Sequence, residues 1–336
     1  MRDFLRLPDD VKRAAYLQVE QSKGLVAASV EKDLWVCLTL RELFSLPGIG
    51  EKLTFKGGTS LSKAWDIIER FSEDIDIVVD KDLLGISRDE SPATAQNNSQ
   101  RDRRLKRLEE ASAKWISEGL MPALLAKMDG LGGKSTLSSE VAGCVSVEYP
   151  SVFAKGAERY VSPVVKIELG ARPENYPNVE RTIVAYVLAD NPKLSTEREF
   201  GVRVISSKRT FWEKVCLLHE ERLRPAGKNR RPRLSRHYYD IWCLSQKGVA
   251  AEAIVDSGLF SMIVDDRKVS YNVSWVQYNQ MTPGALRIMP TDADLAAWRS
   301  DYEKMREEMF FGDSPDFDQL MEQLRELEGR LNDAGR

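Results

Sequence analysis

The sequence predicts an α+β protein in which a domain built on a mixed β-sheet, residues 1–206, precedes a helical domain, residues 207–336. Two observations predict this division. Short β-rich segments alternate with helical segments over the first part of the chain. From about Ser207 onward, apolar residues recur at helical spacing, ending in expected helices at 296–309 and 316–331. At 336 residues, the chain can bury a large core and divide in two.

The elements expected in the first domain follow from the same periodicity. Helices repeat their apolar residues every three or four positions, whereas strands alternate apolar and polar residues. Helices are expected at 9–21, 29–44 and 105–127, and strands at 53–55, 74–79, 144–149, 164–169, 182–188 and 202–205.

The most informative stretch combines a glycine turn with a pair of acids. Residues 56–60 read KGGTS, and residues 72–77, after one short expected helix, read SEDIDI. A glycine turn at the start of a helix offers backbone N–H groups and a positive helix end to a polyphosphate. Asp74 and Asp76 are two positions apart on a strand, so they share one face and can hold Mg²⁺. Together the two runs predict a nucleotide site.

Each run alone also has an ordinary structural interpretation. Gly-Gly before a helix is commonly a turn, and Asp-x-Asp on a strand is commonly a solvated edge. The intervening segment favours a compact unit, because one amphipathic helix is expected where apolar residues recur at Leu61, Ala64, Trp65 and Ile68. The acids alternate with isoleucine and valine along their strand, so they are displayed on a face opposite the anchored one.

The combined motif resembles the active-site signature of the polymerase-β-like nucleotidyltransferases, Gly-Gly-Thr/Ser followed by Asp-h-Asp. Residues 55–61 (FKGGTSL) and 70–76 (RFSEDID) are similar to the AbiEii/AbiGii toxin family of type IV toxin–antitoxin and abortive-infection systems. The spacing from Thr59 to Asp74 is slightly longer than in the superfamily pattern but suits this branch. The resemblance implies a polymerase-β-like nucleotidyltransferase domain, with the helical domain completing the active-site cleft.

The same resemblance implies an activity and its participants. A metal-dependent enzyme, with Mg²⁺ or Mn²⁺, would transfer NMP from an NTP to an acceptor hydroxyl and release pyrophosphate. The 3′ end of tRNA and a cognate antitoxin encoded nearby are implied as acceptor and partner, although the residues themselves specify neither. The nucleotide is expected to contact Lys56, Gly57, Gly58, Thr59, Ser72 and Lys214. The triplet at residues 31–33 (EKD) is also seen in the family, without an assigned role.

A third acid is expected, because two-metal nucleotidyl transfer needs a carboxylate on the metal that activates the attacking hydroxyl. The best candidate is Glu168 in residues 164–169 (VVKIEL), where Lys166 and Glu168 share one strand face and the apolar residues pack on the other. The family's second motif has this Lys-h-acid form. An ordinary amphipathic edge strand with a local charge pair is the alternative.

Two charged residues of the second domain interrupt apolar helical stripes. Lys214 and Asp240 both fall where helical spacing predicts an inward apolar residue. A Lys214–Asp240 ion pair between two helices, or an Arg236–Asp240 pair along one helix, would explain them structurally. The resemblance implies instead that Lys214 meets the nucleotide phosphates while Asp240 orients the nucleotide or another site group. His237 stands where many relatives carry Asp, and it is left out of the catalytic set.

Ser72 is a candidate control point. It precedes Asp74 by two residues and would share its face if the strand extended that far. A negative charge there would repel a triphosphate or disturb the metal, whereas a simple turn hydroxyl is the alternative.

Composition bounds the remaining function classes. No apolar run reaches membrane-spanning length and residues 1–8 lack a signal core, so a cytoplasmic protein is expected. The four cysteines are scattered, which favours buried thiols over disulfides or zinc. The net charge of −3 does not imply nucleic acid, but residues 222–236 concentrate cations that could engage RNA or a triphosphate, or form a loop balanced by acids elsewhere.

Two rival functions stay open at this point. One is nucleotidyl transfer to a protein side chain or a small molecule. The other is a non-catalytic RNA- or partner-binding protein that keeps the fold, against which the intact Gly57, Gly58, Asp74 and Asp76 argue. A P-loop enzyme is disfavoured, because no G-x-x-x-x-G-K-[ST] run occurs.

Overall fold

The computed structural model describes residues 1–128, 131, 136–138, 143–153, 161–171 and 175–333. The chain forms two compact units, each with its own internal packing. The first comprises Met1–Trp65 and Phe71–Ile205, and the second comprises Asp66–Arg70 and Ser206–Arg336. A short segment of the N-terminal part therefore packs with the helical unit.

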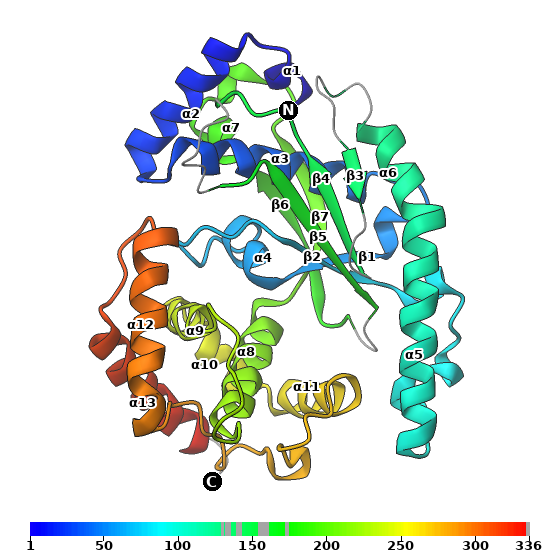
Figure 1. Cartoon of the computed structure of the whole chain (residues 1–336), viewed down its shortest axis with the longest axis vertical. Coiled ribbons are helices and arrows are strands. Elements are labelled where there is room, and N and C mark those ends of the chain that lie inside the picture. Colours follow the sequence, from blue (N-terminus) through cyan, green and yellow to red (C-terminus); the bar gives the residue numbers. More distant parts are fainter. Residues whose placement is uncertain (129–130, 132–135, 139–142, 154–160, 172–174, 334–336) are drawn as a thin grey trace. The chain divides into compact units, whose positions relative to one another are not determined.

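The first unit combines helices with a seven-stranded sheet (Figure 1). Its helices are α1 (Arg2–Leu5), α2 (Asp9–Lys23), α3 (Ala27–Phe44), α4 (Gly57–Lys63), α5 (Asn98–Trp115), α6 (Met121–Met128) and α7 (Tyr186–Asp190). A π-helical turn at Ile116–Leu120 joins α5 to α6. Its strands are β1 (Leu53–Lys56), β2 (Ile75–Val79), β3 (Thr136–Ser138), β4 (Cys144–Glu148), β5 (Val164–Ala171), β6 (Asn178–Val184) and β7 (Glu199–Ile205).

The strand order confirms the predicted mixed sheet. The order is β3-β4-β5-β2-β1-β7-β6. The pairs β2–β5 and β1–β7 are parallel, whereas the other neighbours are antiparallel. The strands that carry the acidic motif, β2 and β5, therefore lie side by side in the middle of the sheet.

The core of the first unit forms where helix α3 packs on the sheet. Helix α3 contacts β5 and β7, and α2 and α7 lie beside it (Figure 1). Ile75 and Ile77 of β2, with Val165 and Ile167 of β5, are fully buried. Full burial of such a side chain contributes about 1.5–3 kcal/mol. These buried residues occupy one face of the sheet, so the residues between them along β2 and β5 lie on the other face, as the alternation of apolar and polar residues predicts.

The second unit is helical, as expected from residue 207 onward. Its helices are α8 (Ser207–Arg222), α9 (Arg236–Gln246), α10 (Val249–Val255), α11 (Ser257–Ser270), α12 (Asp292–Met309) and α13 (Phe317–Asp333). Helix α8 packs against α9, α10 and α11, while α9 also contacts α13. Buried aromatic side chains fill this core, including Tyr239, whose ring centroid lies 4.1 Å from that of Phe310.

Two local predictions are wrong. The connector was expected to be one helix to Ile68, but α4 ends at Lys63. The Trp65 indole then donates to the carbonyl of Ile205, and Asp66 adopts a positive φ of 50°, after which the chain enters the second unit. The strand expected at 182–188 is also too long, because β6 ends at Val184 and α7 begins at Tyr186, whose N–H donates to the Asp33 carboxylate.

Among the described residues, the structure contains no helix of the length and apolar character that a membrane crossing requires. All four cysteines are free thiols, as predicted, and three of them are buried.

Candidate active site

The sheet aligns charged residues from neighbouring strands in one row. The register pairs Asp76 on β2 with Lys56 on β1 and with Glu168 on β5. Cys144 on β4 continues the row beyond Glu168. Paired residues point to the same face of a sheet, on strands about 4.8 Å apart. The third acid expected from the sequence therefore lies on the strand next to Asp76, at the same level of the sheet.

Nearby charges and burial act on Asp76 and on Asp74. Lys56 Nζ lies 3.9 Å from Asp76 Oδ1. Asp74, just before β2, is accessible to solvent, yet surrounding protein atoms partly remove its carboxyl group from water and so raise its pKa. The negative charges of Glu73 and Asp76 raise that pKa further. The cluster of carboxylates thus favours a cation in its midst.

The glycine turn contacts the acidic strand directly. Gly57 has a φ of +78°, a conformation that side chains other than glycine rarely adopt. A Cβ atom added to Gly57 would lie 1.9 Å from Asp76 Oδ2. Only glycine therefore allows the backbone of the turn and the Asp76 carboxylate to approach this closely.

Thr59 ties the turn to the start of the acidic strand. Its hydroxyl donates to the carbonyl of Asp74 at 2.5 Å, and its oxygen lies 2.9 Å from the hydroxyl of Ser72. The Thr59 side chain is buried. Direct nucleotide contacts of Thr59 and Ser72 stay predictions, and β2 begins at Ile75, so Ser72 lies outside the strand whose face it was expected to share.

The three candidate metal ligands are chemically suited to a hard divalent cation. Asp74, Asp76 and Glu168 offer only carboxylate oxygens, the ligands that Mg²⁺ and Mn²⁺ prefer. Over the part of the chain that the structure describes, no three His, Cys, Asp or Glu side chains already form a closed metal-binding group. Asp76 and Glu168 share a sheet face and Asp74 directly precedes β2, but the three carboxylates are not drawn together around a single point.

The second unit places Lys214 and Asp240 in one buried cluster. Lys214 Nζ lies 2.8 Å from Asp240 Oδ2, so the ion pair expected as one alternative is present. Arg70 also binds Asp240, with its Nε and Nη2 atoms 2.6 and 2.9 Å from the two carboxylate oxygens. The sequence indicated no partner for Arg70, although Arg70 opens the run RFSEDID at residues 70–76 that contains the acids.

The buried cluster carries more positive than negative charge. Burial, with the nearby charges of Lys214 and Arg236, lowers the pKa of His237 well below its ordinary value, so His237 is neutral. Burial likewise lowers the pKa of Lys214, and the charge of Arg70 adds to this effect. Arg70 and Lys214 both pair with the carboxylate of Asp240, whose pKa they lower against the opposing effect of burial. An additional anion would stabilise this cluster.

Residues 38–323 match the family described as "Nucleotidyl transferase AbiEii toxin, Type IV TA system". This chain belongs to the AbiEii family. It is therefore a nucleotidyltransferase toxin of a type IV toxin–antitoxin system, and the resemblance read from its motifs is confirmed.

A solved structure with a similar chain is MenT4, a nucleotidyltransferase toxin from Mycobacterium tuberculosis H37Rv. The match covers 98% of this AbiEii chain and 100% of MenT4, at 16% sequence identity and a TM-score of 0.41. A comparison with curated proteins finds no match.

Part of the basic segment of the AbiEii chain, residues 222–236, pairs with nearby acids. Arg230 lies 3.3 Å from Asp294 and 4.4 Å from the Trp298 ring centroid. Arg224 bonds to Glu221. These contacts agree with a loop balanced by acids for the residues that form them, and the engagement of RNA or a triphosphate by the segment stays a prediction.

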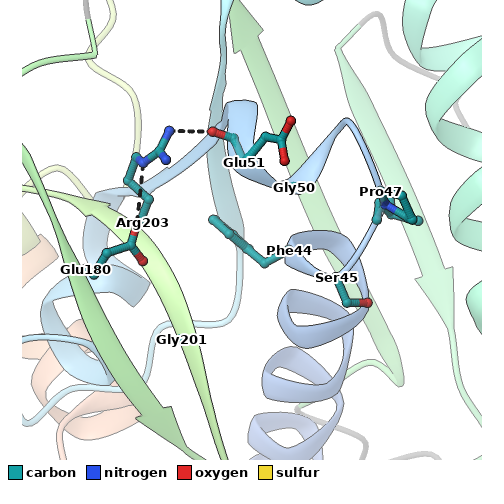
Figure 2. Close-up of a pocket in the computed structure, with 9 residues that line it drawn as sticks. Phe44, Ser45, Pro47, Gly50, Glu51, Glu180, Gly201 and Arg203 are labelled. Atoms are coloured by element: carbon teal, nitrogen blue, oxygen red, sulfur yellow. Dashed lines mark hydrogen bonds and ion pairs between the residues drawn. The ribbon is translucent and has the colours of Figure 1, made fainter.

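A pocket of about 360 Å³ in the first unit lies apart from the predicted site residues (Figure 2). Phe44 supplies an apolar wall. Arg203 donates to the carbonyl of Glu51 and lies 3.5 Å from the Glu180 carboxylate. The pocket is lined by Gly50 and Glu51, which lie just before β1, at the end of this strand opposite Lys56. The pocket is therefore separate from the acidic row.

Gly57→Ala should abolish most nucleotide transfer while the protein stays folded. The added Cβ would displace the Asp76 carboxylate, and a misplacement of about 1 Å in a reacting group costs about 100-fold in rate. Labelled-NTP transfer and thermal denaturation would measure both effects. Gly85→Ala is the matched control, because Gly85 has a φ of +65° but no atom within 4 Å of its added Cβ. Equal activity of the two variants would refute the close-approach argument.

Acid should destabilise the fold through His237. Its folded-state pKa is depressed, so the unfolded state binds the proton first, and the stability present above about pH 6.5 is lost as the pH falls below that value. His237→Gln should flatten this decline by up to about 1.4 kcal/mol per pH unit. Urea unfolding over a pH series would show it. An unchanged slope would mean that His237 is already protonated in the native state.

Proposed function

We propose that this AbiEii-family enzyme transfers NMP from an NTP to an acceptor hydroxyl in a metal-dependent reaction. A bond forms between the acceptor oxygen and the α-phosphorus, the bond from that phosphorus to the bridging oxygen breaks, and pyrophosphate leaves. The alignment of Asp76 with Glu168 on neighbouring parallel strands, against the Gly57 backbone, is the single observation that carries this proposal.

The residues of the first unit would divide the work of binding. Backbone N–H groups at Gly57 and Gly58, with the cation of Lys56, are proposed to contact the phosphates. Asp74, Asp76 and Glu168 are proposed to hold Mg²⁺ or Mn²⁺, as the donor set supports. A bound divalent ion would neutralise phosphate charge and make the acceptor hydroxyl more nucleophilic. Glu168 would help to activate that hydroxyl, and close positioning would supply much of the rate.

The second unit would contribute a phosphate-binding cation. The cluster of Arg70, Lys214 and Asp240 has an excess of positive charge, and a phosphate group would compensate it. Asp240 holds both cations, so we propose that it orients Lys214 rather than touching the nucleotide.

The 3′ end of tRNA is proposed as the acceptor, with family membership as support. Incubation with each of the four labelled NTPs, total RNA and total protein in Mg²⁺ would test the function as a whole. Label in RNA alone supports the proposal. Label in protein or in an added small molecule would identify a different acceptor, and no metal-dependent pyrophosphate release would contradict the reaction. A cognate antitoxin encoded nearby is the proposed partner.

Asp76→Ala should lose transfer by more than about 100-fold, which exceeds the usual cost of mutating an outer-shell partner. The change removes a hard oxygen ligand beside a highly charged triphosphate. Pyrophosphate release and growth on expression would measure the loss. Asp82→Ala is the matched control, because this exposed carboxylate pairs only at the surface, 3.3 Å from Lys52. Near-parental turnover by a folded variant with both Asp74→Ala and Asp76→Ala would end the catalytic assignment.

Lys214→Ala should weaken NTP use more than it lowers the melting temperature. A charged hydrogen bond to phosphate is worth about 1.5–3 kcal/mol, so the KM for NTP should rise about 10-fold or more. The fold should tolerate the change because Asp240 keeps its two bonds to Arg70. Steady-state kinetics and thermal denaturation would separate the effects. A large stability loss with an unchanged KM would leave Lys214 with a structural role alone.

A further inference from the structure

Helix α3 carries three consecutive charged residues inside the protein. Glu31, Lys32 and Asp33 are 2%, 3% and 4% exposed. A buried charge costs free energy unless it is paired, so each of these three side chains is expected to have a partner of opposite charge or a hydrogen-bond partner. Each of the three binds a different segment of the first unit. Glu31, for example, accepts hydrogen bonds from Ser151 and from the N–H of Val152.

Asp33 fixes the helix that follows the glycine turn. Its carboxylate lies 2.7 Å from the ammonium of Lys63, the last residue of α4, and also accepts the N–H of Tyr186. The Lys63 ammonium lies 3.5 Å from the Tyr186 ring centroid. Burial alone would lower the pKa of Lys63, but the charge of Asp33 raises it, so the pair stays ionised. The helix that begins at Gly57 is thereby bound to α3.

Lys32 fixes the entrance to the acidic strand. Its ammonium lies 2.6 Å from Glu73 Oε2, and Glu73 directly precedes Asp74. The Lys32 side chain is buried, whereas Glu73 is about one-third exposed, with 36% of its side-chain area accessible. The contact therefore ties the partly exposed Glu73 side chain to a buried point on α3.

The path of the chain gives these two contacts a role in joining the turn to the acids. Between Lys63 and Glu73, residues 66–70 pack with the second unit, where Arg70 binds Asp240. The covalent connection thus leaves the first unit, and it does not by itself hold the glycine turn against the acids. Besides the Thr59 hydrogen bond and the β1–β2 pairing, adjacent residues of one buried helix hold the two parts, and the separation of Lys32 from Asp33 is set by the helix backbone.

We propose that Lys32 is a positioning residue that, through Glu73, holds the metal-binding acids at a set distance from the glycine turn, which Asp33 anchors through Lys63. This inference rests on the proposed function, because it names what sets the spacing within that site. Lys32 acts through Glu73 and does not contact the substrate. Residues that orient a metal ligand in this way typically change metal affinity or activity by about 10–100-fold when they are mutated.

The test compares Lys32→Met with Lys32→Arg and with Lys52→Met. Mn²⁺ binding to each protein is followed by electron paramagnetic resonance without nucleotide, alongside kcat, KM for NTP and the melting temperature. Lys32→Met should bind Mn²⁺ about 10–100-fold more weakly. Lys32→Arg should retain most of the Mn²⁺ affinity, because arginine supplies a positive charge that can still pair with Glu73. Lys52→Met removes a surface ion pair of the same unit and should bind Mn²⁺ like the parent.

A second variant tests the route through Glu73. Glu73→Gln should weaken Mn²⁺ binding, and adding Lys32→Met to it should cause little further loss, since both changes remove one contact. Parental Mn²⁺ affinity in folded Lys32→Met would overturn the proposal. So would additive losses in the double variant, because Lys32 would then act on the site independently of Glu73.

The outcomes separate this proposal from the proposed reaction. Weakened Mn²⁺ binding by Lys32→Met, in a protein whose parent transfers no nucleotide, would contradict the reaction and support the positioning role. An active parent whose Lys32→Met variant binds Mn²⁺ normally would support the reaction and overturn the positioning role. A parent that binds no Mn²⁺ would overturn both.

Discussion

The close approach of Gly57 to the Asp76 carboxylate is the constraint on which the candidate site depends. A side chain at position 57 would occupy the space of an Asp76 oxygen, so the turn and the acidic strand meet only because glycine is there. Around this contact, the Thr59 hydroxyl secures the start of the strand and the register places Glu168 beside Asp76. The backbone that we propose to bind phosphate and the carboxylates that we propose to bind the metal are thereby brought together.

The two units arrange charge in opposite ways. The first gathers carboxylates on a sheet face and raises the pKa of Asp74, which favours a cation. The second buries Arg70 and Lys214 around one carboxylate, which favours an added anion. The charge of each unit is thus set by its own internal contacts.

Two buried ion pairs lie on either side of the connector between the glycine turn and the acids. Lys63 with Asp33, and Arg70 with Asp240, are both almost fully buried. Such pairs seldom add much stability over apolar packing, but losing one partner is costly. Our hypothesis is that they are retained for position. They hold the helix after the glycine turn and the segment before the acids, the two places where small displacements would separate the parts of the site.

The sequence by itself determined the local features: the glycine turn, the outward direction of Glu168 and the inward direction of Lys214 and Asp240. Side-chain periodicity and motif spacing report these directly. The strand that was expected to carry both Asp74 and Asp76 begins only at Ile75, so the shared strand face of the two acids stays a prediction. Only the tertiary structure decided which strand lies beside β2, where the connector after Lys63 runs, and that Arg70 and Lys32 complete the charge pairs. These contacts join segments far apart in the chain, and periodicity shows which face a residue takes but not which distant residue it meets.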